Sequence, residues 1–292
     1  MTQPVAPQGV GQTAVAVAKF RALESKRRNR LFHDPFAEHF VAAAPPLRRG
    51  PGGGGGGGRK KGSAWRMLRQ LLRPANYAHY RAMPHFIAVR TRFFDDFLRT
   101  ATSDCKQVVI LAAGLDTRAY RLDLPSEVRV FEIDLPEVLA FKEEVVTRQN
   151  AVSSCSRTTV PVDLRDDWPP ALIEAGFRTD QPTAWTAEGL LVYLSEDETT
   201  KLIKGVSTLS APGSRVALGH QDRSTVAQQK SNPLAGAAQT LYRSGLSQDP
   251  AEWLASHGWR ADARRAGQYA GDYGRKLTAD VAAGWLVTAE RE

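Results

Sequence analysis

The chain has 292 residues, of which 42% are hydrophobic and 24% are charged, which is typical of a soluble globular protein with a substantial core. Two cysteines are too few for a disulfide framework or a thiolate metal site, and no stretch approaches the roughly 18 apolar residues of a membrane span. Because the first residues also lack the early positive charges of a secretory signal, we expect a cytoplasmic protein.

The formal net charge of +8 is concentrated in one segment. Residues 47–81 contain nine Lys or Arg and no Asp or Glu, so the rest of the chain is close to neutral. Such a segment could bind an acidic ligand, RNA or a membrane surface, but a solvated basic loop is the simpler interpretation. We therefore expect no nucleic-acid partner.

The first 104 residues are predicted to form a helical N-terminal region. Apolar side chains recur at helical spacing over residues 13–29, and Asp34 followed by Pro35 is typical of a helix start. Residues 50–62 include seven consecutive glycines, whose large ordering entropy predicts a disordered surface loop. Two further helices are expected, a basic amphipathic one over residues 63–74 and a second over 83–101.

From residue 107 onward the sequence alternates between strand and helix patterns. This alternation predicts an α/β fold with a mostly parallel sheet covered on both faces. Strands are expected over residues 107–114, 128–134, 158–164, 214–222 and 283–292, a further strand with its exit is expected within residues 182–194, and helices are expected over residues 135–150, 195–213 and 249–258. Ser195 and Glu198 have the spacing of a capping box. We expect a single domain over residues 1–292, with residues 105–292 as its α/β core.

Acidic residues follow four successive predicted strands. The first strand ends at Gly114 and Asp116, the second at Asp134, the third at Asp163 and the fourth at Glu188. Ligands of open α/β sheets bind beyond the carboxyl ends of the strands. The sequence therefore predicts a ligand site along this edge.

The spacing of Gly114 and Asp134 points to a particular kind of ligand. Twenty residues is the separation at which a dinucleotide-binding fold places a carboxylate that accepts the ribose hydroxyls. Residues 112–119, AAGLDTRA, contain only one of the three glycines of the pyrophosphate fingerprint. A cofactor with a ribose and no phosphate, such as S-adenosylmethionine, explains both observations.

Several motifs resemble those of the bacterial S-adenosylmethionine-dependent methyltransferases related to the leucine carboxyl methyltransferases. They are VVILAAGLDTRAYRL, VFEIDLPEVLAFK, VDLRDDW and PTAWTAEGLLVYLSEDE, together with the upstream TAVAVAKFRALES, LFHDPFAEHFV and IAVRTRFFDDFL. The resemblance covers most of the chain in the right order, although Ala112 stands where many members have Gly and the glycine-rich basic loop is not part of the pattern. It implies a Rossmann-like class I methyltransferase fold, with a seven-stranded sheet, one antiparallel edge strand and an N-terminal helical lid.

The resemblance also implies roles at the first two strand ends. Gly114 and Ala113 would let the methionine part of the cofactor lie on the backbone, and Asp134 would accept both ribose hydroxyls. Asp134 could instead cap the following helix. Asp116 is a further candidate for cofactor binding, with a structural pair between Asp116 and Arg118 as the alternative.

At the ends of the third and fourth predicted strands, the resemblance also implies roles. Asp163 and the Leu164 backbone would bind the adenine of the cofactor. Arg90 or Arg92 would pair with the cofactor's carboxylate, and Glu188 would contact its amino group or the sulfonium. The alternatives are a solvated loop acid for Asp163, a helix-surface ion pair for either arginine, and a structural ion pair for Glu188.

No catalytic residue is assigned, and Glu188 and Tyr193 are the candidates, with a core role as the alternative for Tyr193. No metal is expected.

The predicted reaction is O-methylation of a carboxylate or hydroxyl of a small molecule of secondary metabolism. A hydroxyl acceptor would need a general base, and a carboxylate acceptor would not. The basic residues 59–73 could form a lid that attracts an anionic acceptor. The alternatives are an NAD-dependent oxidoreductase and a non-catalytic relative that binds RNA or protein.

Overall fold

The computed structural model describes residues 10–44, 74–231 and 241–292. The predicted disordered loop over residues 50–62 and the basic lid over residues 59–73 lie outside these ranges. So does the predicted helix over residues 63–74, except for Pro74, at which a much longer helix begins. Among the helices within these ranges, none is long and apolar enough to cross a membrane.

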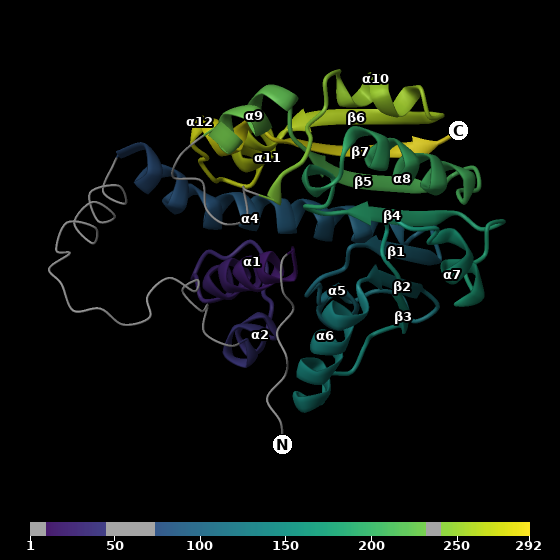
Figure 1. Ribbon diagram of the computed structural model, residues 1–292. Coiled ribbons are helices and arrows are strands. Elements are labelled where there is room, and N and C mark those ends of the chain that lie inside the picture. The colour runs from purple at the N-terminus through teal and green to yellow at the C-terminus, as the bar shows by residue number, and fades with distance from the viewer. Residues whose placement is uncertain (1–9, 45–73, 232–240) are drawn as a thin grey trace, which may run out of the picture.

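The centre of the fold is a seven-stranded sheet in the order β3-β2-β1-β4-β5-β7-β6 (Figure 1). Strands β1 to β5 are parallel, whereas β7 runs antiparallel to both of its neighbours. The strands are β1 Gln107–Leu111, β2 Arg129–Asp134, β3 Ser156–Pro161, β4 Thr183–Ala187, β5 Arg215–His220, β6 Trp259–Arg265 and β7 Trp285–Arg291. The predicted mostly parallel, seven-stranded sheet of a class I methyltransferase is therefore confirmed.

Two features of the sheet differ from the sequence-based expectation. The antiparallel strand β7 is not at the edge, because β6 pairs outside it. The individual strand β6, WRADARR, was not predicted, since four of its seven residues are charged. Its signal is the alternation of Trp259, Ala261 and Ala263, which places three apolar side chains on one face of the strand.

Helices cover both faces of the sheet, because alternate residues of each buried strand point to opposite sides. One core packs Val109 and Trp185 against α7, α8 and α10, and the other face packs Val108 and Ala184 toward α4. The helices are α4 Pro74–Ala101, α5 Arg118–Arg121, α6 Pro136–Arg148, α7 Pro169–Glu174, α8 Glu196–Thr208, α9 Arg223–Ser231, α10 Pro250–Ala255, α11 Ala266–Asp272 and α12 Ala279–Ala282, with a 3-10 turn η1 at Leu191–Tyr193. The predicted capping box of Ser195 and Glu198 starts α8.

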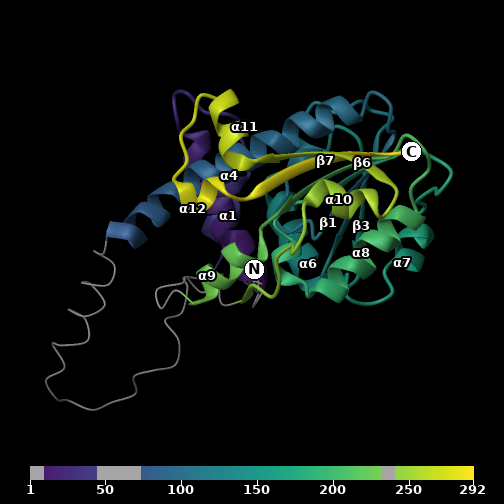
Figure 2. The same cartoon turned by 90° about the horizontal axis from the view of Figure 1, so that it is seen from above.

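The N-terminal helices α1, Val10–Ser25, and α2, Ala37–Ala43, lie beside the ends of the parallel strands (Figure 1). Helix α2 begins later than predicted, with Phe36 rather than Asp34 at its N-cap position. Asp34 Oδ1 still accepts hydrogen bonds from the backbone N–H groups of Phe36 and Ala37, at 3.0 and 3.1 Å. Seen from above, α1 lies close to α4 (Figure 2), and the two helices pack directly against each other.

Candidate cofactor site

The exits of β1 to β4 lie along one edge of the sheet and carry the predicted cofactor residues. Asp134 is the last residue of β2, Gly114 and Asp163 lie in the connections after β1 and β3, and Glu188 directly follows β4. The backbone N–H of Val162 donates to the Asp134 carbonyl at 3.0 Å, which joins the exits of β3 and β2. The topology thus brings together residues that are far apart in the sequence.

The turn after β1 has an unusual backbone. Ala112 and Gly114 have φ angles of 51° and 49°, in the left-handed region that favours glycine. Between them, Ala113 is buried and its N–H donates to the Ile133 carbonyl at 2.9 Å. The left-handed φ of Ala112 is a physical reason why a glycine would suit this position.

Asp134 is joined directly to this turn. Its Oδ2 accepts a hydrogen bond from the Gly114 N–H at 2.6 Å, and its Oδ1 accepts one from the Leu135 N–H at 2.7 Å. Burial raises the pKa of Asp134, although these two backbone donors oppose the shift. Each carboxylate oxygen has a second lone pair, so the group retains the capacity to accept further hydrogen bonds.

Arg118 is the centre of a buried ion network behind the turn. Its guanidinium pairs with Asp95 at 2.8 Å, with Glu188 at 2.8 Å and with Asp116, and Arg121 also pairs with Asp95 at 2.6 Å. Burial favours the neutral form of Asp116, but Arg118 acts together with Lys142, Arg121 and the Arg118 backbone N–H, and their combined effect lowers the pKa of Asp116 to about 2. Both oxygens of Asp116 contact Arg118, as in the structural alternative for this pair.

Asp95 was not among the predicted site residues. The signal for it lies within α4, where Thr91, Phe94 and Leu98 are fully buried at helical spacing and Asp95 lies in the same stripe. A charged side chain in such a stripe needs a buried partner of opposite charge. Arg118 and Arg121 are these partners.

Glu188 joins this network to α4. Its Oε1 accepts from Arg90 Nε at 2.8 Å, and its Oε2 pairs with Arg118 at 2.8 Å. Burial works to raise the pKa of Glu188, but Arg118 and Arg90 outweigh it and lower the pKa. Gly189 has a φ of 65°, and a Cβ there would lie 3.0 Å from Arg90 Nη1, so the glycine lets the guanidinium approach the backbone.

Arg92 points away from this group. It pairs with Asp96 one turn along α4 at 2.8 Å, donates to the Leu31 carbonyl and stacks over the ring of Tyr273. Residues two apart on a helix face nearly opposite directions. Of the two arginine candidates, the structure therefore brings only Arg90 to Glu188.

Asp163 and Leu164 lie at the outer end of the site. Asp163 forms an ion pair with Arg165 at 2.5 Å, and this hydrogen-bonded partner lowers the pKa of Asp163. Leu164 is buried in the core that includes α7 and α8. Asp163 is thus a partly exposed acid beside the exits of β3 and β2.

Tyr193 lies above the exit of β4, at the end of η1. Its ring packs edge-on against Tyr242 with centroids 5.4 Å apart. Burial raises the pKa of Tyr193, opposed by a hydrogen bond with Thr13 and by Arg90. Burial also raises the pKa of Tyr242 to about 12. Tyr242, which no sequence pattern had indicated, thus lies beside the candidate residue Tyr193.

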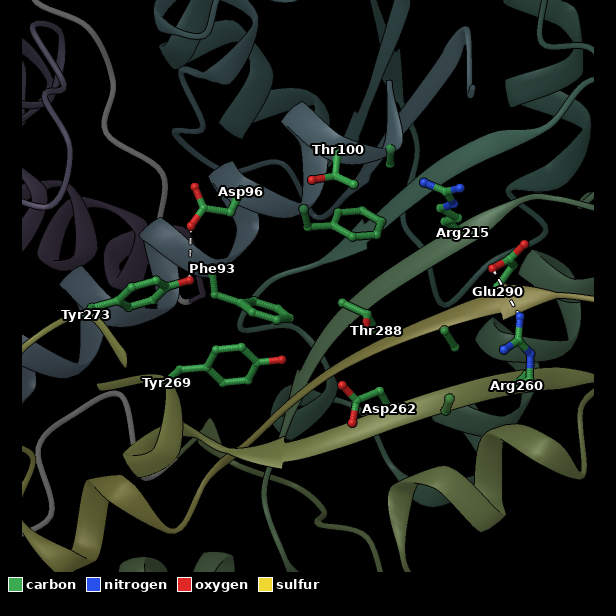
Figure 3. Close-up of a pocket in the computed structure, with 14 residues that line it drawn as sticks. Phe93, Asp96, Thr100, Arg215, Arg260, Asp262, Tyr269, Tyr273, Thr288 and Glu290 are labelled. Atoms are coloured by element: carbon green, nitrogen blue, oxygen red, sulfur yellow. Dashed lines mark hydrogen bonds and ion pairs between the residues drawn. The ribbon is translucent and has the colours of Figure 1, made fainter. Parts of the chain in front are cut away.

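A separate cavity of about 470 Å³ lies on the α4 side of the sheet (Figure 3). Its walls come from the second half of α4, the start of β5, strands β6 and β7, and α11; they include Phe93, Asp96, Arg215, Tyr269 and Glu290. Arg215 begins β5, so the cavity is near the amino ends of the parallel strands. None of the predicted cofactor residues lines it. Within the described ranges, no cluster of three or more His, Cys, Asp or Glu side chains could hold a metal ion.

Comparisons with known proteins agree with this arrangement. The family model described as leucine carboxyl methyltransferase matches residues 14–207. A Streptomyces coelicolor protein named "putative S-adenosyl-L-methionine-dependent methyltransferase" is 41% identical over 278 residues, which cover 94% of this chain and 91% of the relative. A Frankia alni protein of the same description is 41% identical over 292 residues, covering 98% and 96% of the two chains.

Two solved structures share the fold at low sequence identity. A DUF574 family protein from Streptomyces avermitilis has a TM-score of 0.58 and 13% identity, and the match covers 94% of this chain and 97% of that one. A "putative methyltransferase" from Thermobifida fusca has a TM-score of 0.51 and 17% identity, with 77% and 88% covered. These two likenesses concern the fold alone.

The matched family model spans more than half of the chain, and the similar relatives extend over nearly all of it. The predicted family is therefore confirmed, as is the predicted enzyme class, a methyltransferase dependent on S-adenosylmethionine. The chain belongs to the leucine carboxyl methyltransferase family and has the class I methyltransferase fold.

Proposed function

We propose that this protein transfers the methyl group of S-adenosylmethionine to an oxygen of a small-molecule acceptor, and that a carboxylate is the favoured acceptor. The observation that carries the proposal is the contact between Gly114 and Asp134 at the carboxyl edge of the sheet. It combines a left-handed turn, in which Gly114 has no side chain to keep a ligand from the backbone, with a buried carboxylate that can accept hydroxyl donors.

The cofactor's adenosine would lie along the exits of β2 and β3. Asp134 would accept the two ribose hydroxyls through its remaining lone pairs. Asp163 would accept from the adenine amino group, and the Leu164 backbone would contact the ring edge. Because Asp163 is partly exposed and already paired with Arg165, that pair must open or share its carboxylate when the adenine binds.

The methionine part would lie between the β1 turn and the exit of β4. Arg90 would pair with the cofactor's carboxylate, since a guanidinium matches a carboxylate in a planar fork. Glu188 would contact the amino group of the cofactor, consistent with its lowered pKa and full ionisation at neutral pH. Arg118 holds Glu188 from the opposite side, so Glu188 keeps a cationic partner when Arg90 turns to the cofactor.

The two candidate catalytic residues favour an acceptor that is already ionised. Glu188 is an anion held by two guanidiniums, and its lowered pKa makes it a weak proton acceptor. Tyr193 has a raised pKa and is a neutral phenol at neutral pH, so it donates a hydrogen bond rather than removing a proton. A carboxylate attacks the sulfonium without a base, and the protein then contributes orientation and exclusion of water.

We infer that the acceptor belongs to secondary metabolism, as the resemblance implies, and that the protein is cytoplasmic. The cysteines support the second point, because Cys105 and Cys155 form no disulfide. An NAD-dependent oxidoreductase is less well supported, because the β1 turn lacks the phosphate-binding glycines.

Titration calorimetry tests the cofactor, with S-adenosylmethionine, S-adenosylhomocysteine and NAD each added to the purified full chain. We expect binding of the first two and none of NAD. Mass spectrometry then follows a gain of one methyl group on a panel of small carboxylates and phenols. Binding of NAD alone, or no binding of either sulfur compound, contradicts the proposed function, and methylation of phenols only contradicts the preference for a carboxylate.

A further inference from the structure

A buried ion pair from the N-terminal helices touches the turn after β1. Arg21 Nη1 lies 3.1 Å from Asp34 Oδ2, and the two side chains are 7% and 0% exposed. Arg21 Nη2 also donates to the Leu115 carbonyl at 2.6 Å, and the Thr117 hydroxyl donates to Asp34 Oδ2 at 2.9 Å. Two N-terminal side chains thus hold the turn at two points.

The turn needs such support from outside itself. Ala112 and Gly114 both have left-handed φ angles, and a non-glycine residue keeps that conformation only where its surroundings enforce it. On one side the Asp134 carboxylate fixes Gly114, and on the other Arg118 fixes Asp116. Arg21 holds the Leu115 carbonyl between these two points, and Asp34 holds the Thr117 side chain just beyond them.

We propose that Arg21 and Asp34 are positioning residues that keep residues 112–117 in the shape that receives the cofactor. The inference rests on the proposed function, because it assumes that S-adenosylmethionine lies on this turn. Neither side chain contacts the exits of β2, β3 or β4 in the contacts described above, so both act through the backbone of Leu115 and the hydroxyl of Thr117.

Helix α1 itself packs on the turn after β1. Ala14 packs against the turn, since a Cβ placed on Gly114 would lie 3.5 Å from the Ala14 Cβ. Arg21 lies two helical turns further along α1 and anchors the helix to the same turn. The N-terminal helix therefore packs on the turn that binds the cofactor.

The competing interpretation is that Arg21 and Asp34 only fasten the N-terminal helices to the core. A second buried pair on the same helix provides the control, because Glu24 bonds Arg275 at 2.6 Å with side chains 3% and 6% exposed. Arg275 also donates to the Asn29 carbonyl. This pair fastens α1 to the C-terminal part of the chain and has no contact with the turn.

The variants are Asp34→Asn, Arg21→Gln and Arg21→Lys, with Glu24→Gln as the matched control. In Asp34→Asn, one oxygen remains to cap α2, and the acceptor for Thr117 and Arg21 is lost. In Arg21→Lys the positive charge beside Asp34 remains, but a single ammonium replaces the fork that reaches both Asp34 and Leu115. Calorimetry measures the dissociation constant for S-adenosylhomocysteine, and thermal unfolding measures the stability of each full-length variant.

We expect Asp34→Asn and Arg21→Gln to weaken S-adenosylhomocysteine binding about tenfold, equivalent to ~1.4 kcal/mol. Arg21→Lys should fall between Arg21→Gln and the unmodified protein, and Glu24→Gln should bind normally despite a comparable loss of thermal stability. Equal binding by all variants, or an equal loss in Glu24→Gln, overturns the inference.

Hydrogen exchange of the amides of residues 113–117 gives a readout that does not require the cofactor. Exchange should be faster in Asp34→Asn than in Glu24→Gln when the two are equally stable. If the unmodified protein binds no S-adenosylhomocysteine, the proposed function fails and the cofactor role of the pair fails with it. If it binds normally while these amides exchange equally fast in both variants, only the positioning role fails.

Discussion

The backbone N–H of Gly114 donates a 2.6 Å hydrogen bond to Asp134 Oδ2, and this contact joins the exits of β1 and β2. Asp134 is therefore part of the turn as well as a candidate ligand for the ribose. The two roles are compatible because the carboxylate oxygens have lone pairs left after they accept from Gly114 and Leu135. The two roles can be measured separately, because calorimetry reports on cofactor binding and unfolding experiments report on the stability of the turn.

Replacement of Asp134 by Ala should abolish cofactor binding while the fold is retained. Two hydrogen bonds from hydroxyls to a carboxylate, at about 1.5–3 kcal/mol each, correspond to a loss of about 100-fold or more. Calorimetry with S-adenosylhomocysteine measures the loss, and circular dichroism checks the fold. The control is Asp180→Ala, which removes an exposed carboxylate paired with Arg178 at 2.9 Å. A folded Asp134→Ala protein with normal affinity contradicts the ribose role.

The two left-handed positions of the β1 turn should respond oppositely to exchange of Gly and Ala. Gly114→Ala adds a Cβ with ordinary van der Waals space around it, but the left-handed backbone should cost about 1–2 kcal/mol of unfolding free energy. Ala112→Gly relieves the same strain, and the greater entropy of glycine in the unfolded chain offsets part of the gain. Urea unfolding of both variants measures the difference. Equal destabilisation by the two exchanges contradicts the description of this turn.

Arg118 should be the most important single residue for the stability of the site. Arg118→Met leaves Asp116 and Glu188 with one cationic partner fewer in a buried setting, and breaking a buried ion pair costs about 3–5 kcal/mol. The exposed pair of Arg178 and Asp180 supplies the comparison, because Arg178→Met should leave the midpoint of urea unfolding unchanged. If Arg118→Met is as stable as Arg178→Met, the buried network does not support the fold.

The sequence predicted those parts of the fold and site that depend on local pattern and spacing. Strands β1 and β4 are buried along their whole length, and the apolar run Val108–Leu111 of β1 was a direct signal of a buried strand. The pairing of Gly114 with Asp134 followed from spacing, because parallel neighbouring strands end at the same edge. In contrast, the charged strand β6 was missed, since its apolar alternation involves only Trp259 and two alanines.

Contacts that depend on how helices dock could not be predicted from the sequence. Arg90 and Arg92 looked equivalent, and only the packing of α4 against the sheet turns Arg90 toward Glu188 and Arg92 toward Asp96. Likewise, Arg21 meets the Leu115 carbonyl 94 residues further along the chain. Such long-range contacts are set by tertiary packing, and no periodicity in the sequence indicates them.

His220, at the end of β5, should make the stability of the protein depend on pH in the mildly acidic range. Burial lowers the pKa of His220 to about 4, and its Nδ1 accepts a hydrogen bond from the Gln221 N–H at 2.8 Å, which requires the neutral ring. A depressed folded-state pKa contributes stability that is fully present above the unfolded value of 6.5 and is lost as the pH falls through about 4. From these two pKa values, the loss reaches about 3 kcal/mol.

His220→Asn tests this prediction, because the Asn side-chain oxygen can replace Nδ1 as the acceptor and does not titrate in this range. Urea unfolding from pH 7.5 to 4.5 should show the unmodified protein losing stability more steeply than the variant as the pH falls. Asp134 acts in the opposite direction, since its raised pKa gives stability that is lost as the pH rises. Both proteins share that contribution, so the difference between their curves isolates His220. Parallel curves over this range would mean that His220 is not held in the neutral form by the fold.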